Sequence, residues 1–183
     1  MQKRPYFVRE AQFAGYDLML RFDRMNMNEQ VITRFYSAFQ KRDYKTMQDC
    51  YDDKVIFYDP VFEDLVDDEV RLMWEILCKR ATDLSIEFSN VQADEEYGTC
   101  SWTATYTFTR TKRRVTNRIK AHMRFRNGRI IEHSDQFKLS TWCRQAFGFT
   151  GWLLGGTAWF QNRVRKLAQQ NLYDYIVSKQ NEK

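Results

Sequence analysis

The sequence contains few of the residues that interrupt or cross-link a chain. Its 183 residues include two prolines, seven glycines and two histidines, and its four cysteines lie far apart with no C-x-x-C pair. This spacing argues against a disulfide framework and a cysteine-based zinc site, and the composition against a disordered chain. No apolar run approaches the ~20 residues of a membrane span. We therefore expect one cytoplasmic domain with buried free thiols, no metal and no cofactor.

The two ends of the chain differ from its middle. The basic N-terminus is not followed by a continuous apolar run, so a secretory signal is not expected. We assign residues 1–25 to an extension that is either a disordered tail or a weak targeting segment. Residues 26–142 form the main domain. Residues 143–183 form an apolar segment broken by glycines, followed by a helix.

Helical periodicity dominates the first half of the main domain. Val31, Phe35 and Phe39 repeat at intervals of four, and Asn26 with Glu29 predicts a capping box. Three further elements are expected. They are a short helix after Asp43 that buries Tyr44, Met47 and Tyr51, a strand at 55–58 that ends in Asp59-Pro60, and a helix after Asp67 or Asp68.

After residue 82 the period changes to two, which predicts strands. Three long strands follow, and Asn127-Gly128 predicts the hairpin between the last two. The inward side chains of the three strands are Cys100, Trp102, Ala104, Tyr106 and Phe108, then Val115, Asn117, Ile119, Ala121, Met123 and Phe125, then Ile131, His133, Asp135, Phe137 and Leu139. Helices followed by an antiparallel meander indicate an α+β fold.

The order of these motifs resembles the nuclear transport factor 2-like superfamily, in particular its SnoaL-like and ketosteroid isomerase-like group. The resemblance rests on VITRFYSAFQKRDYKTMQDCYDDKVIFYDPVF (31–62) and RNGRIIEHSDQF (126–137). It implies a cone-shaped, curved antiparallel sheet that packs around the N-terminal helices and encloses a pocket. It also implies a homodimer that pairs through the sheet or the terminal segments.

The resemblance allows an enzyme mechanism to be tested residue by residue. Asp59 occupies the position of the general base of the ketosteroid isomerases. The two oxyanion donors of those enzymes are a tyrosine and a protonated aspartate, and here they fall on Phe35 and Ala121. Because neither side chain can donate a hydrogen bond, a steroid isomerase mechanism is not expected.

Another set of inward polar residues could perform acid/base chemistry. His133 and Asp135 share a strand face, and histidine titrates near neutrality. With Asp59 they are our candidate proton-handling groups. Each also has a structural alternative, since Asp59 could be a turn residue and the other two a hydrogen-bonded core pair. The candidate substrate-binding residues are Phe35, Tyr36, Trp74, Trp102, Tyr106, Asn117 and Phe137.

Two surface features allow other functions. Nine Lys/Arg and no acid lie between Arg110 and Arg129, and we expect a solvated or dimer-facing surface there rather than a nucleic-acid site. The apolar segment around Trp152 and Trp159 could contact a membrane interface. Its glycines favour a lid over the pocket or a wrap around a second subunit.

These observations lead to a small-molecule-binding domain. We expect acid/base chemistry of the isomerase, cyclase, dehydratase or hydrolase type on an apolar, cyclic substrate. The alternatives are a noncatalytic interaction or dimerisation module, or a binder of nucleic acid or anionic membrane through the basic face.

Overall fold

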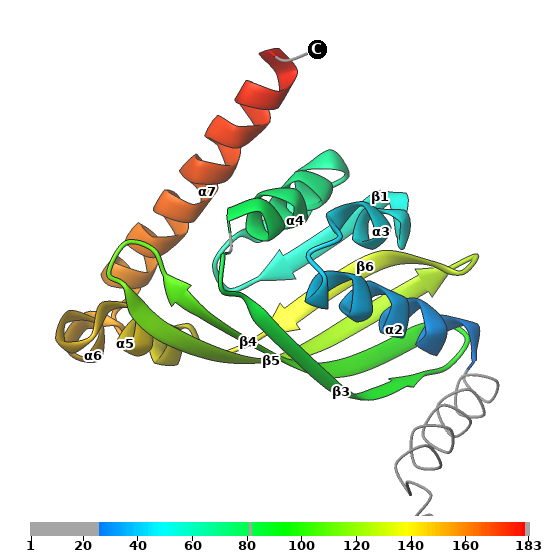
Figure 1. Ribbon diagram of the computed structural model, residues 1–183, viewed down its shortest axis with the longest axis horizontal. Helices are drawn as coiled ribbons and strands as arrows, with labels where there is room; N and C mark the ends of the chain where they lie inside the picture. Colours follow the sequence, from blue (N-terminus) through cyan, green and yellow to red (C-terminus); the bar gives the residue numbers. More distant parts are fainter. Residues whose placement is uncertain (1–25, 81, 182–183) are drawn as a thin grey trace, which may run out of the picture.

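The computed structural model describes residues 26–80 and 82–181, and the extension assigned to residues 1–25 lies outside them. Three helices come from the first half of the chain (Figure 1), namely α2 (Met27–Gln40), α3 (Tyr44–Asp49) and α4 (Asp68–Arg80). The expected capping box starts α2, because Asn26 and Glu29 each accept a backbone N–H of the other. Asp43 caps α3 by accepting the N–H of Thr46. These predictions are confirmed.

Six strands form one sheet, in the order β2-β1-β6-β5-β4-β3. Their bounds are β1 (Tyr51–Asp59), β2 (Glu63–Val66), β3 (Ser85–Ala93), β4 (Tyr97–Phe108), β5 (Arg113–Arg126) and β6 (Arg129–Gln136). Strands β4 to β6 form the predicted antiparallel meander, and β3 pairs antiparallel with β4. Asn127 and Gly128 turn the β5–β6 hairpin with φ of 53° and 72°. One detail differs from the expectation: β1 pairs with β6 in parallel, so the sheet is mixed.

Helix α2 packs on the inner face of the sheet, the face that carries the predicted inward side chains (Figure 1). The approach is closest at Gly98, where an added Cβ would lie 2.8 Å from Cδ1 of Ile32 and 2.9 Å from a ring carbon of Phe125. The main core includes Phe35, Tyr36, Phe39, Tyr51, Phe57, Trp74 and Trp102. All four cysteines are buried and free, as expected.

The C-terminal part forms three helices, α5 (Leu139–Phe147), α6 (Phe149–Leu154) and α7 (Ala158–Asn181). A second apolar cluster joins them to β5 and consists of Val115, Leu139, Trp142, Cys143, Ala146, Phe160 and Val164. Thr157 caps α7 by accepting the N–H of Phe160. The sequence predicted this last helix, but it did not predict α5 and placed Leu139 in the last strand.

The inner face is closely packed where α2 and α4 meet the sheet. Phe35 and Tyr36 are fully buried, and Trp74 is 1% exposed. A cavity large enough for water beside these rings would leave them accessible surface. In this structure these rings contact one another and Phe88 rather than open space.

Two further results concern the described part of the chain. None of its helices is long and apolar enough to cross a bilayer. Within residues 26–80 and 82–181, no three His, Cys, Asp or Glu side chains gather closely enough to hold a metal ion.

Candidate functional site

A chain of hydrogen bonds runs through the core and centres on His133. Its Nδ1 lies 2.7 Å from the hydroxyl of Tyr51, which also accepts the indole N–H of Trp74 at 2.9 Å. Its Nε2 lies 3.2 Å from Oδ1 of Asp135, and the same oxygen accepts the indole N–H of Trp102 at 3.0 Å. A neutral imidazole with its proton on Nε2 fits this arrangement, since Tyr51 then donates to Nδ1. We call these five residues the His133 network.

Aromatic rings enclose the imidazole of His133. The ring centroids of Phe35, Tyr51, Phe57 and Trp74 lie 5.6, 6.1, 5.3 and 6.0 Å from its centroid. His133 is 1% exposed and Asp135 3%. The structure thus brings the two predicted proton-handling residues together, in an interior that is closed to water.

One hydroxyl in this interior has no partner. Tyr36 Oη is buried and forms no hydrogen bond with any described residue. The ring stacks on Phe88 and lies 5.7 Å from that of Trp102. Burial raises the pKa of Tyr36 well above its usual range, and the negative charge of Asp135 raises it further. Tyr36 therefore offers an unused hydrogen-bond donor near Asp135, at a cost of about 1–3 kcal/mol in stability.

Asp59 is the last residue of β1. Tyr58, the residue before it, pairs with Ser134 of β6, so Asp59 lies beside Asp135 on that neighbouring strand. Its Oδ1 accepts the backbone N–H groups of Val61 at 2.7 Å and Phe62 at 2.5 Å. Burial raises the pKa of the Asp59 carboxyl to about 7, against the lowering effect of these N–H groups and with a smaller raising effect from Asp135. Asp59 is thus both a turn residue and a group that titrates near neutrality.

Three other predicted residues are half-buried like Asp59, in contrast to the His133 network. Tyr106 accepts the indole N–H of Trp142 at 2.8 Å. Burial raises the pKa of Tyr106, and the charge of Asp59 raises it further. The side-chain amide of Asn117 has no hydrogen-bond partner among the described residues. We call the region formed by these residues the Asp59 end of the inner face, namely Asp59, Tyr106, Asn117 and Phe137.

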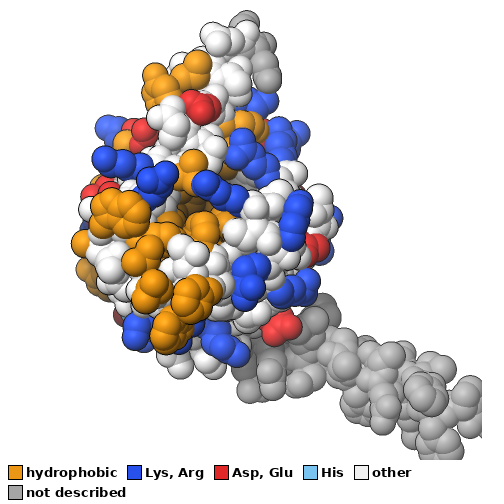
Figure 2. Space-filling view, turned by 90° about the vertical axis from the view of Figure 1, so that its left-hand side faces the viewer, with side chains coloured by type: hydrophobic (Ala, Val, Ile, Leu, Met, Phe, Trp, Pro, Cys, Tyr) orange, Lys and Arg blue, Asp and Glu red, His pale blue; other side chains and the backbone are white. Residues whose placement is uncertain are grey.

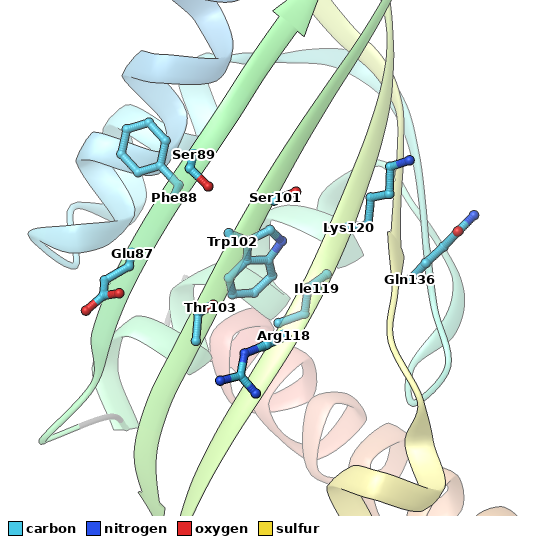
Figure 3. Close-up of a pocket in the computed structure, with 10 residues that line it drawn as sticks. All are labelled: Glu87, Phe88, Ser89, Ser101, Trp102, Thr103, Arg118, Ile119, Lys120 and Gln136. Atoms are coloured by element: carbon cyan, nitrogen blue, oxygen red, sulfur yellow. The ribbon is translucent and has the colours of Figure 1, made fainter.

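A separate groove of about 480 Å³ lies over β3, β4, β5 and β6 (Figure 3). Most side chains along it belong to the outer, solvent-facing register, namely Glu87, Ser89, Ser101, Thr103, Arg118, Lys120 and Gln136. Phe88, Trp102 and Ile119 alternate with them, and their side chains pack inside. The groove therefore lies on the face opposite the His133 network.

The sequence analysis missed two residues of the interior. It placed Tyr51 on a helix face and left Phe57 without a role. Both belong to β1, where Tyr51, Val55 and Phe57 are buried. The sequence shows no regular alternation from residue 51 to 58, and the register of β1 on β6 shifts between Tyr51 and Ile56, so no local signal assigned Tyr51 to the sheet.

Comparisons with known proteins agree with this architecture. The family model described as "SnoaL-like domain" matches residues 32–133, more than half of the chain. An NTF2-like protein of unknown function from Burkholderia pseudomallei has a similar structure, with TM-score 0.58 and 18% identity over 67% of this chain and 98% of that one. A proposed isomerase from Bacillus subtilis (TM-score 0.56, 16% identity, 68% and 96% covered) is also similar.

A proposed polyketide cyclase from Silicibacter has TM-score 0.56 and 16% identity over 64% of this chain and 93% of that one. Among curated proteins, none matches the chain. At these identities the structural likenesses show the fold alone, whereas the family model covers both the Asp-Pro strand and the strand of His133. The chain belongs to the SnoaL-like domain family and has its NTF2-like fold.

Proposed function

We propose that this chain is an acid/base enzyme that acts on an apolar, cyclic small molecule, with Asp59 as the group that exchanges a proton. The observation that carries the proposal is the position of Asp59, which is half-buried beside Asp135 at the edge of an aromatic interior. Burial in apolar surroundings disfavours the carboxylate, so Asp59 can take up and release a proton near pH 7. The likeness to a proposed isomerase and a proposed polyketide cyclase supports this class.

The remaining residues would then bind and orient the substrate. The rings of Phe35, Trp74 and Phe137 offer apolar walls. The free hydroxyl of Tyr36 would donate to a polar substituent, which neither Phe35 nor Ala121 can do. The amide of Asn117 would make a second polar contact. His133 and Asp135, which are already joined by a hydrogen bond, would meet the substrate only once it separates the surrounding rings.

Substrate entry in this proposal takes place at the Asp59 end. Residues there are half-buried, whereas the His133 network is closed. The α5–α7 segment packs directly beside this end, since Trp142 of α5 donates to Tyr106. Movement of this segment would uncover Asp59 and Tyr106, which is the lid role expected from the sequence.

The experiment is a thermal-shift screen with small apolar carbonyl, epoxide and polyphenol compounds, followed by turnover assays of the hits. A ligand at 100 times its dissociation constant adds about 2.7 kcal/mol to stability. Asp59→Asn should retain binding but lose turnover, Tyr36→Phe should weaken binding, and the exposed Asp64→Asn should do neither. Turnover that survives Asp59→Asn would overturn the assigned role.

A second candidate is a noncatalytic homodimeric interaction module. The observation that favours it is the closed packing around His133, which resembles an ordinary core. In that case no compound of the library stabilises the protein, and Asp59→Asn changes stability alone.

A further inference from the structure

Four large apolar side chains project from the α6 region into solvent. Phe149, Trp152, Leu153 and Trp159 are 75%, 62%, 60% and 63% exposed. They lie on α6 and the first turn of α7, and the rings of Phe149 and Trp152 stack with centroids 6.0 Å apart. We call these four residues the apolar tip. Single exposed apolar residues are ordinary, but several large ones together mark an interaction surface.

On the side away from the apolar tip, α6 packs tightly against α5. Gly151 lies so close to α5 that an added Cβ would be 1.9 Å from the carbonyl oxygen of Cys143. A Cβ added at Gly155 would lie 2.8 Å from Cβ of Cys143. The glycines thus allow α6 to pack tightly on α5, and the tip residues project from a fixed support. The segment covers the second core with one side and presents its apolar tip with the other.

Positive charge surrounds the tip. From Gln136 to Tyr173 the chain contains five Lys/Arg and no Asp or Glu. The guanidinium of Arg113, from the β4–β5 hairpin, lies against Gly148, and that of Arg163 lies 6.0 Å from the ring centroid of Trp159. We call the exposed cations of α5, α7 and the β4–β5 hairpin the basic rim, namely Arg110, Lys112, Arg113, Arg144, Arg163 and Lys166. None of the six forms an ion pair with an acidic side chain among the described residues.

Figure 1 places α6 at an outer corner of the molecule, and Figure 2 shows the face that includes this corner. Hydrophobic side chains gather in its lower part, while Lys and Arg side chains lie around and above them (Figure 2). We propose that the apolar tip and its basic rim dock the protein on the surface of a bilayer that contains anionic lipids. The contact is peripheral, with Trp152 and Trp159 at headgroup depth.

The charge of the rim selects this partner over a second copy of the chain. A two-fold contact through the tip would place the same unpaired cations of both copies against each other. An anionic lipid surface instead complements them, and each Lys or Arg near such a surface contributes about 1 kcal/mol to binding. The large, exposed tryptophans suit the same location, because indole rings prefer the membrane–water interface.

The test is flotation of the full-length protein with vesicles of phosphatidylcholine, with and without about 30 mol% phosphatidylserine. We expect binding to the phosphatidylserine vesicles, with a loss of at least about tenfold in partition coefficient in Trp152→Ser/Trp159→Ser and in Arg163→Glu/Lys166→Glu. Tyr97→Ser is the matched control, since Tyr97 is 55% exposed at the opposite end of β4 from the hairpin. Raising the salt from about 0.1 to about 0.5 M should also weaken binding.

Fluorescence gives a second readout. Trp74, Trp102 and Trp142 are buried, so quenching by brominated lipids should act on Trp152 and Trp159 and disappear in their double phenylalanine variant. Circular dichroism verifies that each variant is folded. The proposal is overturned if the folded wild type ignores both vesicle types. It is also overturned if the tip variants bind like wild type, or if the tip supports only self-association in the absence of lipid.

Discussion

The position of Asp59 leads to a specific dependence of stability on pH. The pKa of this carboxyl rises from its ordinary 3.8 to about 7 in the native state, chiefly because burial disfavours the charge. Between these values the native state holds a proton that the unfolded chain has released, so stability must fall as the pH rises from about 4 to about 7. At about 1.4 kcal/mol for each pKa unit, the complete loss is about 4 kcal/mol, and it stays constant above pH 7.

Asp59→Asn removes this titration while its Oδ1 still accepts the N–H groups of Val61 and Phe62. We expect the variant to be more stable than wild type at alkaline pH by up to about 4 kcal/mol, with the difference shrinking toward pH 4. Urea unfolding at 25 °C, followed by tryptophan fluorescence across this pH range, measures it. Asp64→Asn, an exposed carboxylate on β2, controls for the loss of one negative charge. If the free energies of unfolding of wild type and Asp59→Asn change with pH in parallel, the reasoning is refuted.

Further substitutions test other parts of the structure. Tyr36→Phe removes an unpartnered buried hydroxyl and should stabilise the protein by about 1 kcal/mol. Tyr51→Phe leaves two buried hydrogen-bond partners unpaired and should cost about 2–4 kcal/mol. Urea unfolding compares the two variants, and equal effects on stability would contradict the hydrogen-bond assignment. Gly98→Ala should cost about 1–3 kcal/mol in the same assay, because the added methyl group overlaps the side chains of α2 and β5, and a neutral result would argue against the close approach. We also expect a homodimer that pairs through the outer sheet face. Thr103→Arg, which adds a cation beside Arg118 there, should yield monomers in light scattering, and an unchanged mass would exclude this face as the interface.

Local patterns predicted most of the fold correctly. The capping box of Asn26 with Glu29, the cap at Asp43 and the Asn127-Gly128 hairpin act through neighbouring residues, so the sequence alone specifies them. The parallel pairing of β1 with β6 joins segments about 75 residues apart. No local pattern encodes such a partner. Helix α5 was missed for a related reason, because its buried residues follow directly on the alternating residues of β6.

Alternation correctly identified the inner face, and with it His133, Asp135, Tyr106 and Trp102. It could not tell whether the space between these side chains is empty, since occupancy depends on rings from other elements. Phe35 comes from α2, Phe57 from β1 and Trp74 from α4, and all three pack against His133. The hydrogen bond between His133 and Tyr51 likewise depends on the register of β1 on β6, which the sequence did not show.

Two buried groups, Tyr36 and Asp59, carry an energetic cost in this structure. In the closed state Tyr36 has a donor without an acceptor, and the carboxyl of Asp59 is held partly away from water. Both conditions cost stability, and a folded core with no further function has no need of either. A ligand that accepts from Tyr36 and exchanges a proton with Asp59 would relieve both. This energetic cost is the physical argument behind the proposal that the interior binds a molecule.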